Sequence, residues 1–150
     1  MIRGMAIKIL SDVEVNAWAS NQHEFHGVAA LKSLFGYSRT SATADCFYLH
    51  NGGTEGPRTC SLTWYDAREN HPTRSEYRLY YDSCFFYEYA KAGDTMVLTI
   101  DDSNSINIFV IARGTQAASC LINTLARGIS EDYQIISDQS QINAVLSMLR

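Results

Sequence analysis

The chain has 150 residues, of which 46% are hydrophobic and 19% charged, enough for one ordinary hydrophobic core and too few for two. Its formal net charge of −4 and isoelectric point near 5.5 argue against a protein that coats nucleic acid non-specifically, because such proteins carry a basic surplus over a whole face. A local basic cleft is still compatible with this charge. We therefore expect a single domain over residues 1–150.

The cysteines and the hydropathy favour a cytoplasmic protein. Cys46, Cys60, Cys84 and Cys120 are widely and irregularly spaced, which indicates neither a zinc ribbon nor a disulfide framework. No apolar run approaches the roughly eighteen residues that a membrane helix needs, and the N-terminus lacks the layout of a signal peptide. We expect reduced, mostly buried thiols and no membrane partner.

Hydrophobic periodicity predicts short strands separated by turns, with few helices. In chain order, strands are expected at residues 5–10, 13–18, 46–50, 59–65, 77–81, 84–89, 95–100 and 106–112, with 133–136 as an additional candidate. Helices are expected within 27–36, from the cap Thr115 to Arg127, and after the cap Asp138, while 38–44 is expected to be a connection. The sum is an α+β protein of seven or eight short strands in a closed or nearly closed sheet, with two or three helices at its ends.

The segment WYDARENHPTRSEYR, residues 64–78, carries the strongest functional signal. It places Arg68, Arg74 and Arg78 in and beside a polar loop between two expected strands. A guanidinium is planar, permanently charged and forked, so one side chain can donate two parallel hydrogen bonds to a phosphate or to a guanine edge. The chain also has nine arginines against three lysines, which favours geometric recognition over loose positive charge.

The same loop has a simpler interpretation. Its arginines alternate with Asp66, Glu69 and Glu76, and a loop of mixed charge is often only a solvated surface loop. Both interpretations stay open on the residues alone.

The sequence contains no recognisable catalytic set. GxSxG, GxxxxGK[ST] and GxGxxG motifs are absent. The sequence EYAK at 88–91 has a spacing one residue too long for the acidic-x-Lys end of a nuclease centre, and no Pro-Asp precedes it to supply the other carboxylate. His23 and His26 are three residues apart, whereas the zinc-protease helix needs its histidines four apart. We therefore expect a binding module without enzymatic activity of its own, metal site or cofactor.

At the arginine loop the sequence resembles the N-terminal effector-DNA-binding domain of EcoRII-type restriction endonucleases. The resemblance rests on Trp64-Tyr65-Asp66-Ala67-Arg68, on Thr73-Arg74-Ser75-Glu76 at the same distance, and on Arg78. Weaker similarity at 8–11, 31–36 and 105–112 extends it, at low identity, over most of the chain. Pro72 and Tyr77 stand where the family has lysines, and Ser20 and Phe25 where it has a histidine and a tyrosine.

The resemblance implies a B3-like DNA-binding pseudobarrel, an open barrel that grips the major groove with two arms. It makes 68–78 the C-terminal arm and 20–25 the N-terminal arm. It implies that Arg68, Arg74, Glu76 and Arg78 line the DNA cleft and that Lys8 contacts phosphate. The remaining candidates are placed in the arms by neighbourhood: Ser20, Asn21, Gln22, His23, Phe25, His71, Ser75 and Tyr77.

The leading hypothesis is sequence-specific binding of double-stranded DNA, as the effector-site module for CCWGG-like sites in a type IIE restriction endonuclease. The nuclease domain would then be a partner in the parent protein, outside this chain. The first alternative is a stand-alone barrel that binds a protein partner or a small ligand, with the loop holding only charge pairs. The second alternative is a metal hydrolase that uses His23 and His26.

Overall fold

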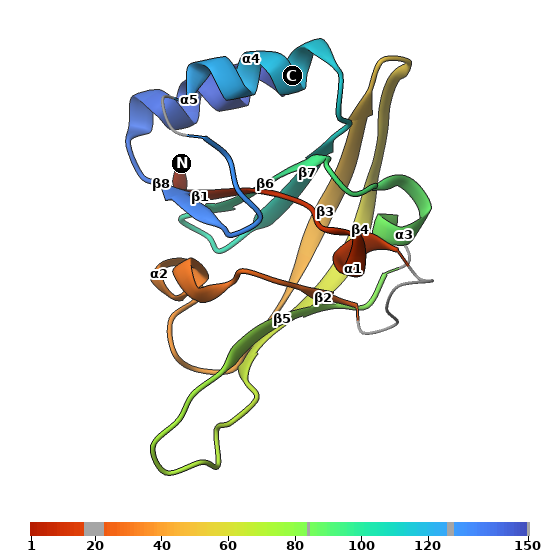
Figure 1. The fold of residues 1–150 in the computed structure, drawn as a ribbon. Coiled ribbons are helices and arrows are strands. Elements are labelled where there is room, and N and C mark those ends of the chain that lie inside the picture. The colour runs from red at the N-terminus through yellow and green to blue at the C-terminus, as the bar shows by residue number, and fades with distance from the viewer. Residues whose placement is uncertain (17–22, 84, 126–127, 150) are drawn as a thin grey trace.

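The computed structural model describes residues 1–16, 23–83, 85–125 and 128–149 (Figure 1). In this part of the chain the elements, in order, are β1 Ile2–Ile9, α1 Asp12–Val15, β2 Glu24–Phe25, the 3-10 turn Ala29–Leu31, α2 Lys32–Phe35, β3 Thr40–His50, β4 Gly53–Asp66, β5 Tyr77–Tyr81, α3 Phe85–Tyr89, β6 Thr95–Asp101, β7 Ile106–Ile111, α4 Gln116–Thr124, β8 Gln134–Ile136 and α5 Gln139–Met148.

The eight described strands form one open, curled sheet in the order β2-β5-β4-β3-β7-β6-β1-β8. All pairs are antiparallel except β3 with β7, which run parallel from the pair Ala44 and Ile106 onward. The longest hairpin, β3–β4, extends well beyond the rest of the sheet at its turn end, as Figure 1 shows. The fold is therefore α+β with eight described strands, as the sequence predicts, and its sheet is an open half-barrel where a closed or nearly closed one was expected.

The hydrophobic core has two parts, one on each side of the curled sheet. The larger part is rich in aromatic residues, among them Trp64, Tyr81, Phe85 and Phe86. The smaller part lies between the sheet and the helix pair α4 and α5 and includes Met5 and Ile7 of β1. Because successive residues of a strand point to opposite faces, β1 is buried on both sides.

Helices α4 and α5 begin as the sequence predicts. The Thr115 side chain accepts a hydrogen bond from the Ala118 amide, and the Asp138 side chain accepts one from the Ser140 amide. Helix α4 ends at Thr124, whereas the sequence predicts an end at Arg127, which lies outside the described residues. The hairpin β6–β7 and the strands β1, β5 and β8 also match their expected positions.

Three local predictions were wrong. Residues 12–15 form the helical turn α1 instead of a strand, because the backbone amide and hydroxyl of Ser11 both donate to the Glu14 carboxylate three residues later. Residues 85–89 form α3, which starts where the Phe85 amide donates to the Ser83 hydroxyl. The Ser/Thr-rich stretch 38–44 is not only a connection, since β3 begins at Thr40. Of the described cysteines, Cys46 and Cys60 are buried, but Cys120 is exposed.

Candidate nucleic-acid interface

The loop between β4 and β5 projects from the barrel as a separate arm. We use "the arm" for residues 67–76, all of which are exposed. In Figure 1 it is the yellow-green loop that extends furthest from the body, at the opposite end from α4 and α5. A projecting loop of this kind can reach into a narrow groove on a ligand that the body of the barrel is too wide to enter.

Asp66, the last residue of β4, closes the base of the arm. Its Oδ1 accepts hydrogen bonds from the backbone amides of Arg68, at 2.9 Å, and Glu76, at 2.7 Å. The Ala67 amide adds a 2.7 Å bond to the Glu76 carbonyl. Further out, the His71 ring accepts from the amides of Thr73 and Arg74. One carboxylate and one imidazole thus organise a loop that has no regular secondary structure.

We expect Asp66→Ala to loosen the arm while the barrel stays folded. Two backbone amides lose their acceptor, which should lower the free energy of unfolding by about 1 kcal/mol for so exposed a site. Amide hydrogen exchange at Arg68 and Glu76 should accelerate, and Asp66→Asn, which keeps an acceptor oxygen, should exchange more slowly than Asp66→Ala. Unchanged exchange in Asp66→Ala would show that other contacts close the arm.

The two arginines of the arm, Arg68 and Arg74, and the neighbouring Arg78 of β5 differ in how they are held. An Arg78 guanidinium nitrogen lies 2.8 Å from the Glu76 carboxylate and another lies 3.6 Å from that of Glu24, whereas Arg68 approaches Glu76 only to 3.9 Å. The hydrogen bond that Arg78 donates to the Glu76 carboxylate, followed by the negative charge of Glu24, raises the pKa of Arg78. Among the described residues, Arg74 forms no ion pair. Its fork therefore has no carboxylate to leave before it binds a ligand.

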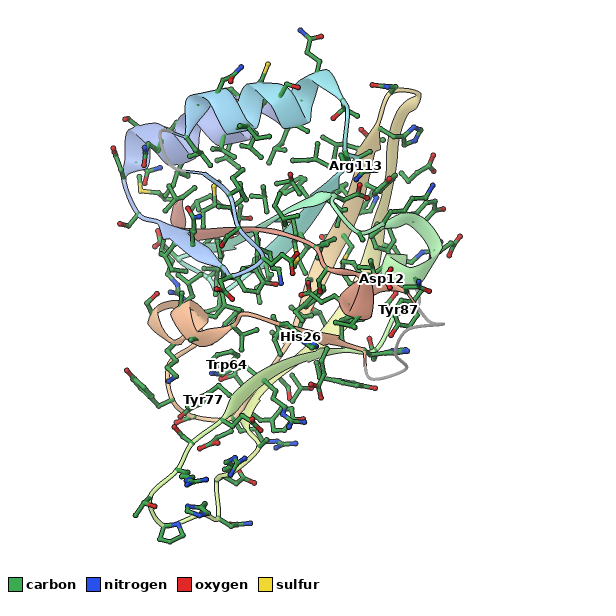
Figure 2. The ribbon with its side chains drawn as sticks, in the orientation of Figure 1. Asp12, His26, Trp64, Tyr77, Tyr87 and Arg113 are labelled. Carbon is green, nitrogen blue, oxygen red and sulfur yellow. The ribbon has the colours of Figure 1, made fainter. Side chains whose placement is uncertain are left out.

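Aromatic rings fix the base of the arm to the barrel on one face. Trp64 is buried, donates from Nε1 to the Gly36 carbonyl at 3.0 Å, and stacks on Tyr77 with 5.1 Å between ring centroids. Figure 2 shows both labelled side chains where the arm leaves the sheet. The Lys32 ammonium lies 5.1 Å from the centre of the Tyr77 ring. Tyr77, a predicted DNA contact, thus packs against the barrel while remaining partly exposed.

The opposite face of the same two strands carries a second cation over a ring. The Arg39 guanidinium lies 5.1 Å from the centre of the Tyr65 ring. Tyr65 is directly opposite Arg78 across the β4–β5 pair, so these side chains share a face. Sequence analysis missed both Arg39 and Lys32, because their proximity to the arm depends on strand register and on the position of α2.

The predicted N-terminal arm is only partly described. Ser20, Asn21 and Gln22 lie outside the described residues. Phe25 is 2% exposed and packs against Tyr81 and Phe86, so its predicted contact with DNA is wrong: it is a core residue of β2. The His23 ring is half-buried, stacks on Tyr81 at 5.3 Å between centroids, and has an Nδ1 without a hydrogen-bond partner among the described residues.

Lys8 is also not the phosphate contact that the sequence predicts. Its side chain is fully buried and forms an ion pair with the equally buried Glu14, and its ammonium donates to the His26 carbonyl at 2.8 Å. Burial lowers the pKa of Lys8, and the opposing charge of Glu14 counteracts the shift. Since no phosphate can reach an ammonium inside the core, the role of Lys8 is structural: it links β1 to α1 and to the end of β2.

The described residues give little support to the metal hydrolase. Over residues 1–16, 23–83, 85–125 and 128–149, no three histidine, cysteine, aspartate or glutamate side chains are grouped so that they could hold a metal ion. Over the same ranges, no helix is long and apolar enough to cross a bilayer.

A cavity of about 550 Å³ lies between α2, the first half of β3 and the β6–β7 turn, with Arg3, Thr40, Asp45 and Asn104 in its lining.

Comparison with known proteins supports the fold. No family model matches the chain, and no curated protein matches it. Among solved structures, the N-terminal domain of Helicobacter pylori LlaJI.R1 has a similar fold. The two superpose with a TM-score of 0.58 at 6% sequence identity, over 89% of this chain and 97% of that one. At this identity the similarity establishes the architecture alone.

Proposed function

We propose that this domain binds double-stranded DNA sequence-specifically, with the arm in the major groove. The observation that carries the proposal is the exposed arm, which is fastened at its base by Asp66 and carries Arg68, Arg74 and Glu76. Arg78 follows the arm on β5 and lies 2.8 Å from the Glu76 carboxylate. Arginine forks suit guanine O6 and N7, and Glu76 can accept from a cytosine amino group, so one arm can address both bases of a G·C pair.

The similarity to LlaJI.R1 supports this function at the level of fold, because that structure is the N-terminal domain of a restriction-related protein. The resemblance to EcoRII-type effector domains adds a more detailed proposal. In it, the chain is the B3-like effector-site module of a type IIE endonuclease, recognises a CCWGG-like site, and acts with a nuclease domain in the parent protein. His71 and Ser75, both exposed in the arm, are further candidates for contact with DNA.

A titration tests the function. The protein is titrated with fluorescently labelled duplexes at 50 and 200 mM salt, with and without chelator. The duplexes carry CCWGG, a scrambled sequence, or sequences recovered by selection from a random library. Specific binding should exceed binding to the scrambled duplex by about a thousandfold or more, and chelator should have no effect. Equal, weak binding to every duplex would refute sequence-specific recognition, and loss of binding with chelator would favour the metal hydrolase.

We expect Glu24→Gln to raise the affinity for DNA. Glu24 is mostly buried, repels phosphate and holds one side of the Arg78 fork. Releasing an ion pair of this kind is worth up to about 1 kcal/mol, so binding should tighten up to about fivefold, for specific and scrambled duplexes alike. Glu55→Gln, which removes a carboxylate paired with His50 on the β3–β4 hairpin, is the control and should leave affinity unchanged. Weaker binding by Glu24→Gln would mean that Glu24 orients Arg78 productively.

The cavity beside α2 supports a second candidate function, the binding of a small ligand. Its volume of about 550 Å³ is sufficient for a small molecule, and its lining mixes apolar side chains with Arg3 and Asp45. A ligand there should shift the NMR signals of Leu34, Ala42 and Ile106 in a screen of small anions and nucleotides. Shifts confined to the arm would instead support DNA binding.

A further inference from the structure

The charges of the arm, together with those of Asp66 and Arg78 at its base, cancel. Three arginines face three acidic residues in the set Asp66, Arg68, Glu69, Arg74, Glu76 and Arg78. Duplex DNA carries one negative charge per about 1.7 Å of its axis, and neutralising phosphates supplies much of the affinity of most DNA-binding proteins. An arm without net charge can read bases but cannot by itself hold the backbone, so the cations for the backbone have to come from elsewhere.

Arg39 and Lys32 supply such cations at the base of the arm. Each lies over a tyrosine ring, at 5.1 Å from the ring centre, and neither forms an ion pair among the described residues. Arg39 is exposed and Lys32 partly exposed. Stacking on a ring restrains a long side chain without neutralising its charge. Both groups therefore keep their full charge available to an anion.

The two rings point to opposite faces of the hairpin. Tyr65 pairs with Arg78 across β4 and β5, whereas Tyr77 pairs with Asp66, the next position along β4. Because directly opposed residues share a face and successive residues alternate, Tyr65 and Tyr77 lie on different faces. Arg39 and Lys32 thus flank the base of the arm from two sides.

A major groove is about 12 Å wide and is bounded by the phosphate backbones of the two strands. A hairpin that enters it presents one face to each backbone. We infer that Arg39 and Lys32 are phosphate-binding residues that grip opposite strands of the duplex while the arm reads the bases between them. This inference rests on the proposed function and adds to it a second class of contact, indifferent to sequence.

The inference is tested by measuring the salt dependence of DNA binding by Arg39→Gln, Lys32→Gln and the double variant. Each is titrated with a CCWGG duplex and a scrambled 24-base-pair duplex between 50 and 300 mM salt. Each single change should reduce the slope of log K against log salt by about 0.9, and the double change by about twice that amount. The ratio of specific to scrambled affinity should stay within about twofold. Arg39→Lys, which keeps the charge, should keep the wild-type slope.

Arg58→Gln is the matched control. Arg58 is also an exposed arginine placed over aromatic rings, those of Phe85 and Tyr89. It is paired with Glu88 at 2.7 Å and lies near α3, away from the arm, so its replacement should leave the slope unchanged. If the wild type binds and the Arg39 and Lys32 variants keep its slope, the inference fails while the proposed function stands. A fall in the specificity ratio would likewise overturn it, since phosphate contacts carry no sequence. If the wild type binds neither duplex nor any selected one, the proposed function fails and the inference with it.

Discussion

Lys8→Met should lower the free energy of unfolding by about 3–5 kcal/mol, because it leaves the Glu14 carboxylate buried without its counter-charge. Both side chains are fully buried, and the Glu14 carboxylate also accepts from the amides of Ser11 and His26. Replacing the lysine with an apolar side chain of similar length preserves packing but leaves the Glu14 carboxylate in the core without an opposite charge. Urea unfolding followed by tryptophan fluorescence measures the loss.

Two further variants isolate the charge. Lys8→Met combined with Glu14→Gln removes both charges and keeps an acceptor for Ser11, so it should recover at least half of the lost stability. Lys91→Met, at an exposed lysine, should change stability little. A loss below about 1 kcal/mol for Lys8→Met, or weaker DNA binding by a variant of unchanged stability, would contradict the structural role of Lys8.

Arg74→Ala and Arg78→Ala should each weaken binding to the specific duplex by about 1–3 kcal/mol and relax the preference at one base pair. The reason is that a forked donor pairs with guanine O6 and N7, and alanine offers neither a donor nor a charge. Arg74 has no carboxylate partner among the described residues, so its loss should appear in binding without any change in stability. Titration against all four bases at each position of the site measures the preference.

The lysine variants at the same positions separate recognition from charge. Arg74→Lys keeps a positive charge but cannot fork, so it should retain the salt dependence and lose the base preference. Arg39→Lys should differ from it by keeping both the salt dependence and the base preference. Equal weakening on specific and scrambled duplexes by Arg74→Ala would assign Arg74 to phosphate and refute base readout by that residue.

The sequence predicts an element of the fold well where contacts between residues close in the chain determine its structure. The polar run at 67–76 lies between two strands whose periodicity is clear, so the position of the arm followed from sequence alone. Helix starts at Thr115 and Asp138 were likewise local capping signals. The hydrophobic pattern at 84–89 predicted a strand where residues 85–89 form α3, because an aromatic run fits a buried helix as well as a strand.

The site residues that sequence analysis misplaced depend on tertiary contacts. Lys8 resembles a surface cation until Glu14 and the His26 carbonyl are found beside it in the core. Phe25 is apolar, but only its packing against Tyr81 and Phe86 shows that it faces inward. The neighbours Arg39 and Tyr65 are 26 residues apart and meet only because β3 and β4 pair in this register.

Recognition of DNA by this domain depends, in our proposal, on the arm contacting guanine in the major groove. The most direct test replaces each guanine of the tightest-binding duplex in turn with 7-deazaguanine, which lacks the N7 acceptor but pairs normally. At one or more positions the wild type should lose about 1–3 kcal/mol, and Arg74→Ala or Arg78→Ala should no longer sense that replacement. Wild-type affinity that is unchanged by replacement at every guanine would contradict the claim.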